Sequence, residues 1–270
     1  MSTLVTDRRE DRERLRRAPE RRGGPAPGGL RSRLRRPLRY LGTPLLVAVA
    51  FGLLYRYVQA RELDSIEARI LDARNLQHAA IEHLDISLWS TAIVLATAIP
   101  VGIALTRPWA RRATPAFVTV ANIGQGVPAI GTFVLAFLIV TRSGRTAAIV
   151  GLVVYCFLPV LRATMVGLEQ VDPGVIKAGR GMGLSRGQVL RRIELPLSVP
   201  ILLTGVRTAL VLNVSTAPLA GFVGGGTLGR IIIGGFAQSR AVAVLTGAVL
   251  AAGFALLADW IGGVAEDVLR

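Results

Sequence analysis

The segment EQVDPGVIKAGRGMGLSRGQVLRRIELP, residues 169–196, separates two long apolar blocks and is rich in glycine and basic residues. Asp172 followed by Pro173 predicts a helix start, because an aspartate side chain caps free N–H groups and proline fits the first helical position. Gly183 suits the left-handed residue that ends a helix. The segment therefore begins with a short helix that ends at a glycine turn.

A second short helix is expected directly after this turn. Ser185 and Gln188 have the spacing of a capping box, in which each side chain bonds to the backbone of the other. Leu195 and Pro196 are expected to stop this helix before the next apolar block. The first helix carries a narrow apolar stripe at helical spacing, formed by Val175, Ala178, Gly179 and Met182. Both helices are expected to lie at the inner membrane face.

The remaining chain consists mainly of apolar blocks, and 51% of its 270 residues are hydrophobic. The blocks are continuous and do not alternate at period two, and each approaches the roughly 20 residues that a membrane-spanning helix needs. Glycines and Pro128 interrupt the third block. We predict an all-α membrane protein with about six transmembrane helices, at residues 41–58, 86–106, 115–140, 146–168, 197–221 and 241–262.

The first 39 residues hold thirteen arginines against five acidic residues. We interpret them as a disordered basic arm that is attracted to anionic lipid. A nucleic-acid-binding arm is the alternative for such a charge run, but we expect no nucleic acid as a partner. Residues 40–80 would form an extra span with an outer loop, and residues 81–265 the core. His78 and His83 would flank an exposed turn before the second span, without metal-ligand spacing.

Basic residues in short loops predict the orientation of the spans. The arm, residues 107–112 and residues 169–196 are basic, and six spans place all three on one side. Residues 60–81, which are rich in acidic residues, fall on the other side. We therefore expect a multi-pass protein of the cell membrane with both termini in the cytoplasm.

The 169–196 segment resembles the EAA loop of ABC importer permeases. Lys177, Ala178 and Gly179 take the place of Glu-Ala-Ala, Gly183 follows after three residues, and Ile193-Glu194-Leu195-Pro196 follows after nine more. The spacing agrees throughout. Lys177 in place of glutamate and Gly179 in place of the second alanine depart from the pattern, and leave open how the loop pairs with charged residues of an ATPase.

The resemblance implies partners and a role. In ABC importers the first helix of this loop docks on ATPase subunits, so Asp172, Pro173, Lys177, Ala178, Gly179, Gly183, Ile193, Leu195 and Pro196 are the candidate coupling residues. The implied partners are ABC ATPase subunits, an extracytoplasmic substrate-binding protein and a second permease subunit, identical or related. The chain itself would bind no cofactor, since ATP would be bound by the ATPase subunit.

Shorter blocks between residues 77 and 234 resemble the permeases of glycine betaine, choline and carnitine uptake. They include residues 82–88, 121–128, 158–162, 205–209 and 223–229. This implies a permease that forms the pathway for a quaternary-ammonium osmoprotectant. The same fold importing another small solute, such as an amino acid, and a secondary transporter remain as alternatives. Aromatic residues are only 6% of the chain, and no aromatic cluster suggests an ammonium cage.

Polar residues inside two spans mark a candidate translocation pathway, because such residues persist in a membrane only where protein or water surrounds them. They are Asn122, Gln125 and Pro128 in the third span and Asn213, Ser215 and Thr216 in the fifth. Hydrogen bonding between helices is the alternative role. Arg207 lies within the fifth span, and its guanidinium is expected to have a partner, by a structural ion pair or a carbonyl contact rather than by contact with substrate.

The chain lacks the sequence patterns of a catalytic protein. There is no phosphate-binding loop of the type Gly-x-x-x-x-Gly-Lys-Ser/Thr, no His-Glu-x-x-His and no paired-cysteine metal site. We therefore expect a non-catalytic subunit without a bound metal ion.

Overall fold

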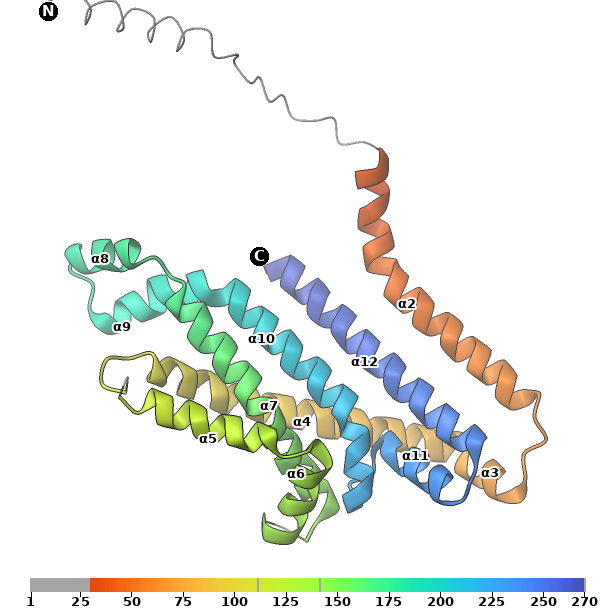
Figure 1. Ribbon diagram of the computed structural model, residues 1–270. Helices are drawn as coiled ribbons and strands as arrows, with labels where there is room; N and C mark the ends of the chain where they lie inside the picture. The colour runs from red at the N-terminus through yellow and green to blue at the C-terminus, as the bar shows by residue number, and fades with distance from the viewer. Residues whose placement is uncertain (1–29, 111, 141, 270) are drawn as a thin grey trace, which may run out of the picture. The chain divides into compact units, whose positions relative to one another are not determined.

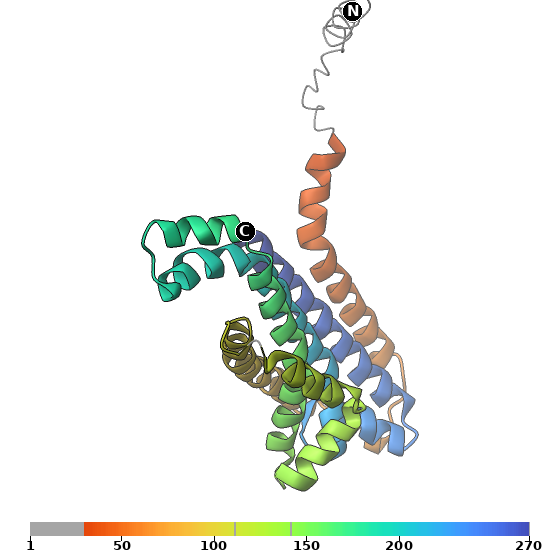
Figure 2. The same ribbon diagram turned by 60° about the vertical axis from the view of Figure 1, so that its left-hand side comes forward.

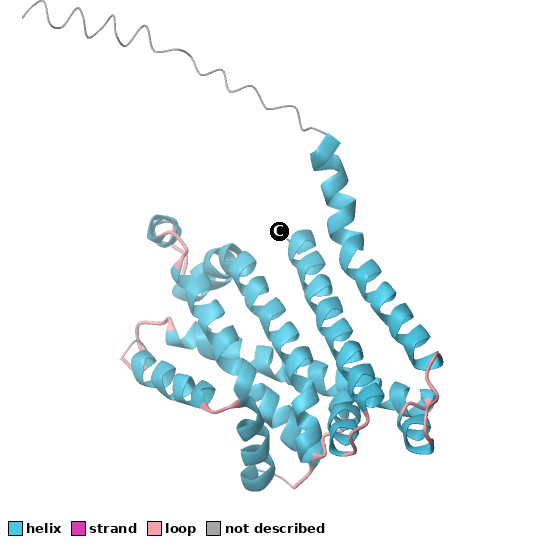
Figure 3. Cartoon of the chain, turned by 45° about the vertical axis from the view of Figure 1, so that its right-hand side comes forward, coloured by secondary structure: helices cyan, strands magenta, loops and turns pink. Residues whose placement is uncertain are grey.

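The computed structural model describes residues 30–110, 112–140 and 142–269. All regular elements in these ranges are helices, as Figure 3 shows by colour. Five helical stretches are long and apolar enough to cross a membrane, and a bent helix pair makes a sixth if it is counted as one span. The prediction of an all-α membrane protein with about six spans is confirmed. Most of the basic arm, residues 1–29, lies outside the described residues.

The long helices are α2 (Leu30–Gln59), α4 (Ala73–Leu105), α7 (Gly144–Glu169), α10 (Leu195–Thr216) and α12 (Ala241–Leu269). Short elements connect them, namely α3 (Ser65–Ile70), α5 (Thr114–Gly126), α6 (Ala129–Leu135), η1 (Ala136–Val140), α8 (Pro173–Gly181), α9 (Arg186–Val189), η2 (Leu190–Glu194), η3 (Ala217–Val223) and α11 (Thr227–Ala237). The elements η1 and η2 are π-helical turns, and η3 is a 3-10 helix.

The second span is longer than expected. It was placed at residues 86–106, but α4 begins at Ala73, where Asp72 caps it by accepting a hydrogen bond from the backbone N–H of Arg74 at 3.0 Å. The expectation that His83 lies beside an exposed turn is therefore wrong. His83 is fully buried, with its ring 5.9 Å from that of Phe254 in α12.

The core of the bundle forms where α4 and α10 pack on α7 (Figure 1). Glycines at both contacts bring the backbones close together. A Cβ atom at Gly102 of α4 would lie 2.8 Å from Thr164, and one at Gly205 of α10 would lie 2.5 Å from the Cβ of Ala163. Membrane helices commonly pack through small residues. Because lipid tails are as apolar as the side chains, the hydrophobic effect does not drive helix association, and close van der Waals packing is needed instead.

The membrane-spanning part of α2, from Tyr40 onward, lies along α12. Phe51 of α2 packs on Gly253 at a position where any side chain would overlap its ring. The Phe51 ring also meets the Phe254 ring edge-on, with centroids 6.5 Å apart. Near the end of α12, the indole N–H of Trp260 donates to the backbone carbonyl of Tyr40 at 2.7 Å.

The bundle has two distinct ends, visible in Figures 1 and 2. The hairpin end carries α8, α9 and the last turn of α12. The α11 end carries α3, η3 and α11. The basic residues Lys177 and Arg180 lie at the hairpin end of the bundle. The acidic residues Asp64, Glu67 and Asp72 lie at the α11 end.

Candidate functional sites: the α8–α9 hairpin, the α5–α7 face and the Arg207 network

The local geometry of the α8–α9 hairpin follows the sequence closely. The Asp172 side chain accepts the backbone N–H of Gly174 at 2.7 Å, and Pro173 is the first residue of α8. Gly183 has a φ of +86°, the left-handed conformation that side chains disfavour. Ser185 and Gln188 form the expected capping box at the start of α9.

Close packing holds the two arms of the hairpin together. Gly179 is buried beneath the side chain of Ile193, and a Cβ atom at this position would overlap Ile193 Cδ1. Leu184 and Val189 lie beside the same contact. An alanine at position 179 would require the end of the Ile193 side chain to shift, so glycine allows the closest contact of the two arms.

The outer face of α8 is free within the chain. Val175, Ala178 and Met182 are exposed, and Met182 retains 75% of its accessible surface. Lys177 and Arg180 are exposed on the same helix. An exposed apolar stripe flanked by positive charge is typical of a surface that contacts another protein, because burial of the apolar side chains in the contact is favourable.

A groove of about 460 Å³ runs between the hairpin and the loop after α4. Arg107 of that loop donates to Glu194 Oε2 at 2.6 Å and so joins the loop to η2. Trp109 stands at the groove with 77% of its surface exposed. The ion pair fixes the hairpin to the membrane-spanning helices, so movement of one would be transmitted to the other.

The predicted helix stop at Leu195 and Pro196 is wrong. The chain passes from α9 through η2 into α10 without leaving helical geometry, so residues 186–223 form one continuous helical stretch. Pro196 stands in the first turn of α10, and π-helical turn η2 precedes it. Proline is tolerated there because the π-turn already changes the hydrogen-bond pattern. The hairpin is thus a rigid extension of a membrane helix.

The third span is broken at the predicted place. The axes of α5 and α6 meet at 95°, and Val127 and Pro128 form the break. Asn122 of α5 is exposed and its Oδ1 accepts a 2.6 Å hydrogen bond from Arg162 of α7. The side chain of Gln125 lies outside the described residues. A groove of about 350 Å³ lies beside this pair, between α5 and α7.

The candidate pathway residues of the fifth span have different surroundings. Asn213 is fully buried, and its amide donates to Thr91 Oγ1 of α4 at 2.8 Å. Ser215 is exposed and bonds to the backbone of Leu212 in its own helix at 3.2 Å. Thr216 ends α10 and is partly buried. Asn122 and Asn213 thus contact different helices, α7 and α4, and do not meet within one chain.

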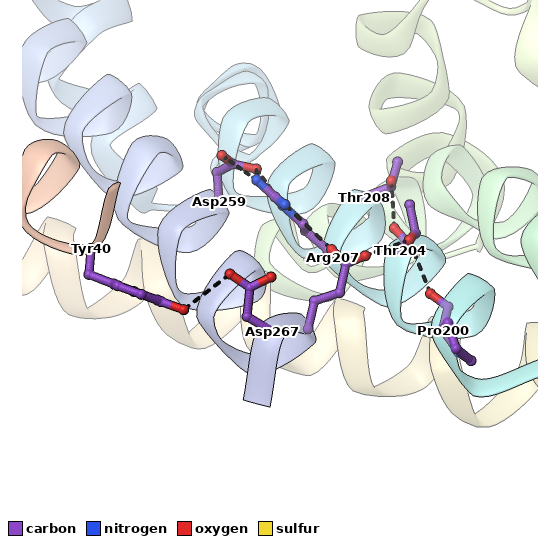
Figure 4. A network of polar contacts seen from close by, with 8 residues as sticks. Tyr40, Pro200, Thr204, Arg207, Thr208, Asp259 and Asp267 are labelled. Carbon is purple, nitrogen blue, oxygen red and sulfur yellow. Dashed lines mark hydrogen bonds and ion pairs between the residues drawn. The ribbon is translucent and has the colours of Figure 1, made fainter. Parts of the chain in front are cut away.

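Arg207 has the partner that its position requires. Its guanidinium donates two hydrogen bonds to the partly exposed Asp259 carboxylate, both at 2.8 Å (Figure 4). It also approaches Glu266 Oε2 at 3.5 Å. Gly262 and Gly263 of α12 leave room for the arginine side chain. The sequence analysis missed Glu266, although an acidic pair seven residues apart on one face of an apolar helix was a usable signal.

These sites lie within the part of the chain that matches known proteins. Residues 98–268 match the family described as the binding-protein-dependent transport system inner membrane component. The chain belongs to this family. The match includes the α8–α9 hairpin, the Asn122–Arg162 pair and the Arg207 network, whereas α2, α3 and most of α4 precede it.

Individual relatives of this permease are osmoprotectant transport proteins. The osmoprotectant import permease OsmY of Salmonella typhimurium is 33% identical over 228 residues, which are 83% of this chain and 94% of the relative. The permease OpuCB of the glycine betaine/carnitine/choline system of Bacillus subtilis is 35% identical over 186 residues, 68% of this chain and 84% of the relative.

A solved structure with the same fold is the inward-facing MetNI methionine ABC transporter. A chain of it superimposes with a TM-score of 0.65 and 26% identity, covering 72% of this permease and 96% of that chain. An amino acid ABC transporter gives the same TM-score of 0.65 at 14% identity, which shows the fold alone.

Proposed function

We propose that this permease is the membrane subunit of an ATP-driven importer for quaternary-ammonium osmoprotectants such as glycine betaine, choline, carnitine or proline betaine. The observation that carries the proposal is the identity of 33–35% to relatives named for osmoprotectants, for glycine betaine, carnitine and choline, or for choline alone, over two thirds of the chain or more. The permease would form the pathway and would leave ATP hydrolysis to a separate subunit.

The α8–α9 hairpin is the proposed contact with the ATPase subunits. Its exposed apolar stripe and its basic flank fit a protein partner, and its helical continuity with α10 fits a lever. Closure of two ATPase subunits would push on α8, and α10 would carry this displacement into the membrane. A rigid attachment is necessary, since a flexible loop would absorb the movement.

Further partners follow from this assignment. An extracytoplasmic binding protein would deliver the solute at the α11 end, and a second permease subunit would complete the pathway. Both OsmY and OsmW of Salmonella typhimurium resemble this permease, at 33% and 29% identity. A related rather than identical second subunit is therefore as consistent with the relatives as a homodimer.

The hairpin end is the proposed cytoplasmic end. Basic residues of the hairpin and Arg107 gather there, and the acidic residues between α2 and α4 gather at the other end. Both termini would then be cytoplasmic, with residues 1–39 as a lipid-facing arm. The added span and outer loop, expected at residues 40–80, would end before Ala73, where α4 begins, so the core expected at residues 81–265 would include all of α4.

We assign the pathway to the broken third span and its neighbour α7. The exposed Asn122 and the break at Pro128 support this, with Gln125 on the same helix. We assign Asn213 to helix packing, because its amide is used by Thr91. Ser215 and Thr216 would line the pathway only at its outer end.

The second candidate function is import of an amino acid by the same fold. The similarity to the methionine transporter structure favours it, at 26% identity. We place it second because the identity to the osmoprotectant relatives is higher.

Uptake of labelled solutes tests the proposal. The permease would be expressed with its ATPase and binding-protein partners in cells that lack their own betaine systems. We expect ATP-dependent uptake of glycine betaine or choline that unlabelled methionine does not reduce. Methionine uptake without uptake of either ammonium compound would overturn the osmoprotectant assignment and keep the permease.

A further inference from the structure

Arg162 and Arg207 each lie seven or more residues from the ends of a membrane-spanning helix, and their surroundings differ. Arg207 of α10 faces two carboxylates, Asp259 and Glu266. Arg162 of α7 faces only the neutral amide of Asn122, at 2.6 Å. No carboxylate among the described residues lies within ion-pair distance of Arg162. Among the described residues, the charge of Arg207 is therefore neutralised by carboxylates, and that of Arg162 is not.

Arg162 lies within the length of α7 and not at its end. It precedes Glu169, the last residue of α7, by seven residues, roughly 10 Å along the helix axis. Asn122 stands eight residues into α5, so both side chains lie inside the span. The hydrogen bond to Asn122 holds the guanidinium beside α5. A charge so placed requires water or an anion beside it.

The guanidinium retains donors for a second partner. It has five N–H groups in a planar fork, and Asn122 accepts from one nitrogen, Nη2. Arg162 is exposed within the chain, so the remaining groups are accessible. A carboxylate is the planar anion that fits two parallel donors of arginine.

Beside this donor lies an apolar groove with two aromatic rings. Ala121, next to Asn122, and Leu158, one turn before Arg162, both line it. Phe117 and Phe157 line it too, with ring centroids 6.4 Å apart. The sequence analysis recognised no aromatic cluster, because these residues are 40 positions apart. Ring faces attract methylated ammonium groups.

We propose that Arg162, oriented by Asn122, binds the carboxylate of a zwitterionic solute as the solute passes along the α5–α7 face. This inference rests on the proposed function and makes it more specific. A solute with a carboxylate and a quaternary ammonium group would use the arginine and the aromatic groove together. Choline, which has no carboxylate, would gain nothing from Arg162 and would be repelled by its charge.

The test compares two solutes in proteoliposomes that hold the complete transporter with its binding protein. Arg162→Gln removes the charge, and Arg162→Lys keeps it without the planar fork. The matched control is Arg230→Gln, because Arg230 of α11 donates to Asn75 Oδ1 at 2.9 Å in the same kind of exposed pair. Maximal rates of glycine betaine and choline uptake are the readout, since the binding protein would dominate the half-saturation concentration.

We expect Arg162→Gln to lower the maximal rate for glycine betaine roughly tenfold or more, the range for loss of a charge-assisted hydrogen-bond pair. Choline uptake should be unchanged or faster. Arg162→Lys should retain part of the betaine rate, and Arg230→Gln should leave the ratio of the two rates unaltered. A role in folding or in lipid anchoring would lower both rates alike.

Equal effects of Arg162→Gln on the two solutes, or no effect on either, would overturn this inference and leave the proposed function intact. The same conclusion would follow from a wild-type permease that carries choline and not glycine betaine. A wild-type transporter that carries neither compound would overturn the proposed solute class and this inference with it.

Discussion

At the scale of the residue, the permease shows how charge is kept inside a membrane. Arg207 combines bidentate bonding to Asp259 with contact to Glu266, and Thr204 donates to Glu266 Oε1 at 3.0 Å. Arg207 bonds to both carboxylates, so its removal would take away the positive charge that they share. A sequence alone predicts that such a partner exists, but the partner is 52 positions away and only helix packing selects it.

Replacement of Arg207 by methionine should therefore destabilise the permease. We expect a loss of about 1–3 kcal/mol, the range for loss of hydrogen bonds to charged groups. The melting temperature of the purified permease in detergent measures this loss. Arg230→Met is the control, because Arg230 is exposed and its partner Asn75 is neutral. Equal melting temperatures for the two variants would show that the Arg207 network contributes nothing to stability.

At the scale of the element, helix contacts depend on glycines that sequence patterns do not distinguish. Gly205 and Gly52 both lie in apolar helices, yet a Cβ atom would meet Ala163 at the first and open space at the second. Caps were predictable because Asp172, Gly183 and Ser185 act on their own neighbours. The continuation of the helix through Pro196 was not predictable. It depends on a π-helical turn at Leu190–Glu194, whose residues have no distinctive sequence.

Replacing each of these two glycines by leucine should show whether stability depends on helix packing or on helix propensity. Gly205→Leu forces α10 away from α7, and we expect a loss of roughly 1–3 kcal/mol, typical of overpacking. Gly52→Leu adds a good helix former at an open position and should be neutral or slightly stabilising. Thermal unfolding in detergent distinguishes them, and a Gly205→Leu variant as stable as wild type would contradict the observed α10–α7 contact.

At the scale of the whole molecule, the number of spans and the break in the third were predictable from apolar blocks and from Pro128. The contacts of the candidate pathway were not. Asn122 and Asn213 looked equivalent in the sequence, but Arg162 faces one and Thr91 the other. Such pairings arise from the arrangement of α4, α5, α7 and α10, and no local pattern encodes it.

The orientation in the membrane is a whole-molecule prediction. Cys156 is fully buried, and its replacement by alanine gives a background without cysteine. Single cysteines would be placed at Arg180 of α8 and at Arg69 of α3, both exposed and at opposite ends. We expect a membrane-impermeant maleimide to label position 69 in intact spheroplasts, and position 180 only after lysis. The reverse pattern would contradict a cytoplasmic hairpin.

The most direct test of the account is ATP-driven solute uptake by a pair of glycine variants in the hairpin. Gly181 and Gly183 are two residues apart, both exposed, and a Cβ atom at either meets nothing within 4 Å. Only Gly183 has a left-handed backbone, with a φ of +86°. A β-branched residue is strongly disfavoured in that conformation, so Gly183→Val would change the angle between α8 and α9.

The measured quantity is uptake of glycine betaine and choline by the reconstituted complex, with ATPase subunits quantified in the same vesicles. We predict that Gly183→Val loses most ATP-driven uptake of the transported solute while Gly181→Val stays within about twofold of wild type, a change of less than 1 kcal/mol. Equal uptake by the two variants would contradict the claim that the hairpin geometry couples the ATPase to the transport pathway.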